Sequence, residues 1–224
     1  DNPNFAAVVT GRITDSAAGP GLTKTGSGTL VLAGTSDLST GIRVDAGTLQ
    51  ISNEGALGYS GLSLTGGSLA FRFDGRGANP GFSDNGSGLP EVVAFSGGDI
   101  RLNGNHTILV DRWGFLGGPV WNKAANKVAK LMGAGPNGTQ FTGSNQTLTL
   151  SSANGFGMEF AMGVALNNGT TTTFNIVSPG AEVGSNRNPA LTISGMISGS
   201  NIGSTILRKS GAGVLQLTSE GNES

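Results

Sequence analysis

Residues 22–32 of this chain read LTKTGSGTLVL, and residues 207–217 read LRKSGAGVLQL. The lysine, both glycines and both closing leucines recur in the same order and spacing. Upstream, VTGRI at 9–13 and ISGMI at 193–197 match in the same way after a single one-residue gap. Such a recurrence is typical of stacked, repeating architectures rather than of an enzyme built around one pocket. We therefore expect residues 193–224 to begin a second copy of the repeat, and the chain to be one stretch of a longer array.

The composition indicates ordered β structure. Glycine supplies 40 of 224 residues, far above the usual share of about 7%. Disorder is excluded because 36% of the residues are hydrophobic, and disordered chains are poor in such residues. Thirteen basic and fourteen acidic side chains give a net charge of −1, so no basic face is available for nucleic acid. Cysteine is absent, which excludes disulfides, thiolate metal sites and cysteine nucleophiles.

Apolar and polar residues alternate with a period of two in many short runs. Examples are TLVLA at 29–33, TLQI at 48–51 and TTTFNI at 171–176. Clusters of Gly, Asn, Asp and Ser separate the runs, and a Leu-x-Leu pattern returns about every 20 residues, as in solenoids. We predict an all-β fold in which residues 1–224 form a single parallel β-helix segment. Leu, Ile, Val and Phe would point inward, with glycine at the corners.

Two stretches interrupt this pattern. Residues 74–90 are rich in Gly, Asn and Ser and predict a long loop excursion. Residues 111–138 contain both tryptophans and predict an insertion with one short helix, from Trp121 to Met132. Trp121, Ala125, Val128 and Met132 would share one face of that helix. We expect the insertion to cover a sheet or to protrude from the side of the solenoid.

Residues 21–51 resemble the passenger-associated β-strand repeat of autotransporter proteins. That pattern reads approximately L-x-K-x-G-x-G-T-L-x-L-x-G and, after a spacer, T-G-x-x-V-x-x-G-T-L-x-(I/V), and this chain matches both halves. The second copy departs from it with Ala212 between the glycines and Val214 in place of Thr. The resemblance implies a right-handed parallel β-helix, secreted and held at or shed from a Gram-negative-type cell surface. Attachment to a membrane would come from parts outside this chain.

No catalytic or metal site stands out among the titratable residues. His106 is the only histidine, and because no nucleophile or orienting carboxylate is evident from spacing, we expect a surface or turn residue. The acidic residues lack an Asp-x-Asp pairing, and we expect them to be solvated, although stacking could bring distant ones together. Calcium-binding nonapeptides are absent, so no metal or cofactor is expected. These acidic residues are Asp74, Asp84, Glu91, Asp99, Asp111, Glu159 and Glu182.

Three aromatic residues are the candidates for a surface contact. Trp113, Phe115 and Trp121 lie in the glycine-rich insertion and could anchor a protein partner or a sugar. The alternative is that these side chains pack between the insertion and the β-helix.

We expect a structural extracellular protein, not an enzyme: a surface stalk, fibre or adhesin body that self-associates through its terminal coils as a filament or tandem array. A glycan or a host or cell-surface molecule is the candidate ligand. One alternative is a carbohydrate-active β-helix enzyme, a polysaccharide lyase or hydrolase, which would need two or three convergent carboxylates in a groove on one sheet face. The other is a phage tail fibre, which would form a trimer.

Overall fold

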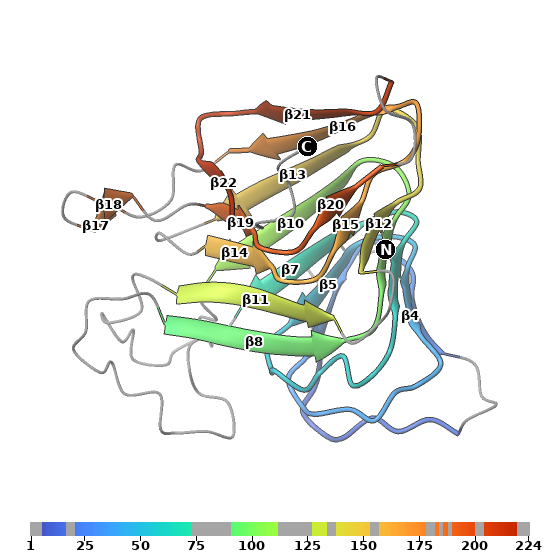
Figure 1. Ribbon diagram of the computed structural model, residues 1–224. Helices are drawn as coiled ribbons and strands as arrows, with labels where there is room; N and C mark the ends of the chain where they lie inside the picture. The colour runs from blue at the N-terminus through green and yellow to red at the C-terminus, as the bar shows by residue number, and fades with distance from the viewer. Residues whose placement is uncertain are drawn as a thin grey trace.

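The computed structural model describes residues 6–16, 21–72, 91–111, 127–133, 138–152, 157–177, 182–183, 186–187, 190–199 and 204–218. All regular secondary structure in these residues is β-strand. Except in one short hairpin, every strand pair is parallel. The strands stack as coils from the blue N-terminal turns to the red C-terminal turns (Figure 1). The predicted all-β parallel β-helix is confirmed.

Three sheets form the faces of the coil. The eight-stranded sheet has the order β1 (Ala6–Val9), β3 (Thr29–Leu32), β5 (Thr48–Ile51), β7 (Ser68–Arg72), β10 (His106–Asp111), β13 (Thr147–Ser152), β16 (Thr171–Ile176), β21 (Ile206–Ser210). The seven-stranded sheet has the order β2 (Leu22–Lys24), β4 (Ile42–Val44), β6 (Leu62–Leu64), β9 (Ile100–Leu102), β12 (Thr139–Phe141), β15 (Val164–Ala165), β20 (Ile197–Ser198).

The third face is shorter. The five-stranded sheet has the order β22 (Leu215–Leu217), β19 (Leu191–Ile193), β14 (Gly157–Phe160), β11 (Lys127–Gly133), β8 (Glu91–Gly97). A separate antiparallel hairpin, β17 (Glu182–Val183) and β18 (Asn186–Arg187), projects from the side (Figure 1).

The coils lengthen along the chain. On the seven-stranded sheet the first three strands begin at residues 22, 42 and 62, as the 20-residue period predicts. The next four begin at 100, 139, 164 and 197. The first three coils pass from the eight-stranded to the seven-stranded sheet through turns, whereas each later coil adds a strand of the five-stranded sheet between them. The longer period is therefore explained partly by a third strand in each coil.

The core is built from ladders of apolar side chains in register. Ile42, Leu62 and Ile100 occupy equivalent positions on three neighbouring strands and are buried. Phe141 and Phe174 meet edge to face, with ring centroids 5.3 Å apart. Burying one such aliphatic side chain contributes about 1.5–3 kcal/mol, so the stacked ladders are the main source of stability.

The predicted helix at 121–132 is wrong where the structure describes it. Residues 127–133 form β11, which pairs with β8 along one edge and with β14 along the other. A short apolar run fits both helical and strand periodicity, and pairing on two edges satisfies its backbone hydrogen bonds as a strand. Residues 127–133, although part of the predicted 111–138 insertion, therefore belong to the five-stranded sheet of the β-helix itself. Residues 112–126, and the excursion at 74–90, lie outside the described residues.

The described residues contain no helix that is long and apolar enough to span a membrane.

Candidate functional site

The lysine of the repeat motif clamps two coils together. Lys24 ends β2 and is only 7% exposed. Its Nζ donates to the carbonyl oxygens of Thr25 at 2.8 Å, Gly26 at 2.7 Å and Ala46 at 3.0 Å. Three acceptors match the three donors of an ammonium group, and Ala46 belongs to the next coil. Desolvation lowers the pKa of Lys24 from its usual 10.5, while the carbonyl oxygens favour the charged form.

A glycine of the next coil closes over this clamp. Gly47 has φ of 69°, in the left-handed region that favours glycine. A Cβ on Gly47 would lie 2.4 Å from the carbonyl oxygens of both Gly26 and Gly28, and 2.6 Å from the Lys24 Nζ. Gly47, in the G-T-L segment of one coil, must therefore be glycine because the K-x-G-x-G segment of the preceding coil packs directly against it.

The second copy of the motif lies one face further round the coil. In the first copy the strands on either side of the glycines are β2, in the seven-stranded sheet, and β3, in the eight-stranded sheet. In the second copy they are β21, in the eight-stranded sheet, and β22, in the five-stranded sheet. The motif thus encodes a corner between two faces, whichever faces these are.

The second copy has only part of the clamp. Lys209 is exposed, and its Nζ donates to the Gly211 carbonyl oxygen at 2.6 Å, the same own-turn contact that Lys24 makes to Gly26. Among the described residues no later coil supplies the acceptor that Ala46 provides in the first copy. Lys209 lies in register with Phe174 of the preceding coil, on the inward side of the strand.

Asparagines replace the lysine clamp in the middle coils. The Asn105 Oδ1 accepts a hydrogen bond from the Thr147 backbone N–H at 2.7 Å, and the Asn145 Oδ1 accepts from Thr171 N–H at 3.0 Å. Each bond joins one coil to the next at the same corner. Asn145 has φ of 49°, a conformation that asparagine tolerates better than most residues.

His106 is buried, so the expected surface position is wrong, although the residue directly follows the turn between two coils. It is 4% exposed, because it begins β10 on the inward side of the strand. Its Nε2 lies 3.0 Å from the Asn103 carbonyl oxygen and its Nδ1 lies 3.4 Å from that of Gly67. Both oxygens can only accept, and a neutral imidazole has one N–H to donate. The ring is thus packed against backbone carbonyls at the corner between coils.

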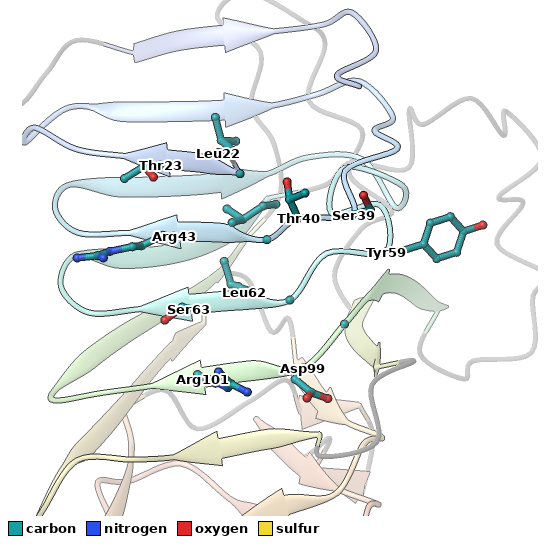
Figure 2. Close-up of a pocket in the computed structure, with 15 residues that line it drawn as sticks. Leu22, Thr23, Ser39, Thr40, Arg43, Tyr59, Leu62, Ser63, Asp99 and Arg101 are labelled. Carbon is teal, nitrogen blue, oxygen red and sulfur yellow. The ribbon is translucent and has the colours of Figure 1, made fainter. Parts of the chain in front are cut away.

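A groove of about 540 Å³ lies on the outer face of the seven-stranded sheet. It crosses β2, β4, β6 and β9 near their amino-terminal ends (Figure 2). Arg43 and Arg101 lie on its strands, Ser39 and Thr40 on a turn beside them, and Tyr59 at one side (Figure 2). The side chain of Tyr59 extends away from the sheet, and the residue is 77% exposed.

Both groove arginines are held through one nitrogen. The Arg43 Nε donates to the Asp45 carboxylate at 2.5 Å, and the Arg101 Nε donates to the Gln140 Oε1 at 3.2 Å. Thr65 also donates to Asp45, and these bonds from Thr65 and Arg43 lower the pKa of Asp45. The Nη groups of both arginines remain for other contacts.

The Asp15 carboxylate orders two hydroxyl groups that line the groove. Asp15 accepts hydrogen bonds from the Thr40 Oγ1 at 2.6 Å and the Ser39 Oγ at 3.1 Å, and from both backbone N–H groups. These bonds, the Thr40 hydroxyl first, lower the pKa of Asp15 to about 2. Asp15 therefore connects the first coil to the turn beside the groove.

The acidic residues singled out in the sequence are separated where the structure describes them. Asp99 lines the groove, and Glu159 accepts a hydrogen bond from the Ser194 Oγ at 2.5 Å elsewhere. Glu91, Asp111 and Glu182 lie on β8, β10 and β17. In the described ranges, no three His, Cys, Asp or Glu side chains form a cluster suited to a metal ion.

The predicted surface contact at Trp113, Phe115 and Trp121 lies outside the described residues, as do Asp74 and Asp84. The groove was missed from the sequence. Its signal is the similar IRV at 42–44 and IRL at 100–102, each with an arginine between two buried residues. The long segment between β6 and β9 hides the fact that β4 and β9, which carry these two arginines, are only two positions apart in the sheet.

The comparisons with known proteins bear on the repeat. The family model of the passenger-associated-transport-repeat matches residues 22–51, which is the stretch that contains the Lys24 clamp and Gly47. No curated protein and no solved structure matches the chain. The family match confirms the resemblance found in the sequence: residues 22–51 match the passenger-associated transport repeat of autotransporters.

Proposed function

We propose that this chain is part of the body of a secreted bacterial surface protein. It would act mechanically, as a stalk, fibre or adhesin shaft rather than as an enzyme. The passenger-associated repeat supports export to a Gram-negative-type cell surface. Parallel coils joined by backbone hydrogen bonds and an apolar core support a stiff rod.

The last described coil supports a second part of this proposal, that the chain associates end to end. β20, β21 and β22 are each the final strand of their sheet, and an open strand edge is a template for pairing with another strand. Ile206 is 52% exposed and Leu217 is 48% exposed on these strands. Lys209 adds a donor in the position that Lys24 uses to bind the following coil. A further coil, from neighbouring repeats or from another copy of the chain, would pair with these strand edges, cover Leu217 and bring an acceptor to Lys209. It would also lie beside Ile206, which is in register with Thr171 on the outward side of the sheet.

Sedimentation velocity and negative-stain electron microscopy of the chain over a range of concentrations test the proposal. We expect association that grows with concentration and rods that lengthen by end-to-end addition. The double variant Ile206→Asp, Leu217→Asp should abolish this association, because it places two charges on the open end. Val177→Asp is the matched control, since Val177 is also 48% exposed but follows β16 on the preceding coil. A monomer at every concentration, or equal loss with the control, would refute self-association through this end.

A further inference from the structure

The groove on the seven-stranded sheet has features that a mechanical role does not require. Arg43 and Arg101 project from its floor, and Ser63 lies between them in register. The backbone positions of the two arginines are therefore two strand spacings apart, about 10 Å for strands spaced at 4.7–4.9 Å, and the Arg43 side chain turns along its strand to Asp45. Both point to the outer face, since their neighbours on each strand are buried.

The arginines are positioned before any ligand arrives. Each is held through Nε, by Asp45 or by Gln140, which limits the freedom of a long side chain. The Nη groups that remain can contact a carboxylate with two nitrogens, a geometry for which guanidinium groups are suited. Two such contacts at a fixed separation select a ligand with regularly spaced negative charges.

The other groups around the groove suit sugar rings. The Ser39 and Thr40 hydroxyls donate to Asp15, so their lone pairs remain to accept hydrogen bonds from ligand hydroxyls. Tyr59 offers an exposed ring at the side, with an apolar face and a polar tip. Arg43 and Arg101 are the cations that line the groove and Asp99 is the anion. Asp45, paired with Arg43, and Asp15, bonded to Ser39 and Thr40, lie beside the lining.

We propose that this groove binds an acidic polysaccharide lying along the helix axis. The ligand class is a chain with a carboxylate on every second sugar, because one disaccharide is similar in length to two strand spacings. Arg43 and Arg101 contact successive carboxylates, and the hydroxyls and Tyr59 contact the sugars between and beside them. The site lies on the side of the rod and does not depend on end-to-end assembly.

Isothermal titration of the whole chain with hyaluronan hexasaccharide, which has a carboxylate on every second sugar, tests the proposal. Chitohexaose is the neutral probe of the same length. We expect binding of the acidic probe that weakens with added salt, since exposed charges are screened, and no measurable binding of chitohexaose. Arg43→Gln and Arg101→Gln should each weaken binding about five- to tenfold, the loss of one charge-assisted contact.

Arg208→Gln is the matched control, because Arg208 is an exposed arginine on β21 in the eight-stranded sheet and should leave the affinity unchanged. Equal binding of both probes, equal weakening by Arg208→Gln, or no binding of the acidic probe would overturn the proposal. Shortening of the hexasaccharide during the titration would overturn it in favour of a polysaccharide-cleaving enzyme. The Ile206→Asp, Leu217→Asp variant should bind normally, so failure of the assembly proposal can be told apart from failure of this one.

Discussion

At the scale of single residues, the motif lysine has two different environments in one chain. Lys24 is buried and donates to three carbonyl oxygens, whereas Lys209 is exposed and donates to one. The sequence around them is nearly the same. The difference arises because a following coil covers Lys24 and supplies the Ala46 carbonyl oxygen.

Lys24→Met should therefore cost far more stability than Lys209→Met. The first leaves three carbonyl oxygens without their donor, and we expect a loss of about 2–3 kcal/mol in the free energy of unfolding. The second changes an exposed side chain and should cost less than about 0.5 kcal/mol. Urea denaturation of both variants measures the difference at concentrations where the chain is monomeric. Equal losses would contradict the inter-coil clamp.

Glycine also has two roles within the motif. Gly26 and Gly47 both have left-handed φ angles, of 71° and 69°. A Cβ on Gly26 would meet nothing within 4 Å, whereas a Cβ on Gly47 would clash with two backbone oxygens. The same substitution at the two sites separates backbone strain from steric clash.

We expect Gly26→Ala to destabilise the chain by about 1–2 kcal/mol, the cost of a left-handed conformation for an L-residue. Gly47→Ala should cost more than about 3 kcal/mol, because the coils must move apart as well. Thermal melts followed by circular dichroism at 218 nm, together with urea titrations, measure both. If Gly47→Ala were no worse than Gly26→Ala, the close approach of the two coils would not be a constraint.

At the scale of elements, most strands could be predicted and the helix could not. Short alternating runs such as 48–51 and 171–176 form strands as predicted, because one face of each is buried. The 121–132 pattern placed Val128 and Met132 on one helical face, yet both lie in β11. Pairing with β8 and β14 determined that this segment is a strand. Local periodicity cannot predict pairing with strands that lie far away in the sequence.

Asp15, which lies between β1 and β2, ties the first coil to the turn at Ser39 and Thr40 of the next coil. Asp15 has its pKa lowered to about 2 from 3.8 by hydrogen bonds that the unfolded chain lacks. Its contribution to stability is therefore present above about pH 4 and is lost as the pH falls through 2. We expect Asp15→Asn to lower the melting temperature at neutral pH and to reduce the loss of stability between pH 4 and pH 2.

Melting curves across that pH window compare Asp15→Asn with Glu54→Gln. Glu54 lies in the turn after β5, and the structure gives it no hydrogen bond among the described residues. Glu54→Gln should keep the acid dependence of the unchanged chain. The same dependence in Asp15→Asn would mean that Asp15 does not tie the first coil to the turn at Ser39 and Thr40.

At the scale of the whole molecule, the last described coil and the side of the solenoid present different chemistry. The last described coil has strand edges with no partner among the described residues, exposed Ile206 and Leu217, and a lysine with one acceptor. The side presents a polar groove with two arginines in fixed register. A solenoid can combine both, because each coil contacts only its neighbours, and outward side chains contribute little to the core.

The sequence by itself determined that the chain is a β solenoid and which residues form its repeated corner. Both follow from local patterns: alternation sets the inward face, and the K-x-G-x-G spacing sets a turn that needs left-handed glycines. Only the tertiary structure decided which residues of one coil are covered by the next coil. Stacking buried Lys24 and left Lys209 exposed, turned residues 127–133 into a strand, buried His106, and placed Arg43 and Arg101 in one groove. Each of these depends on contacts between residues far apart in the chain, and such contacts leave no period in the sequence.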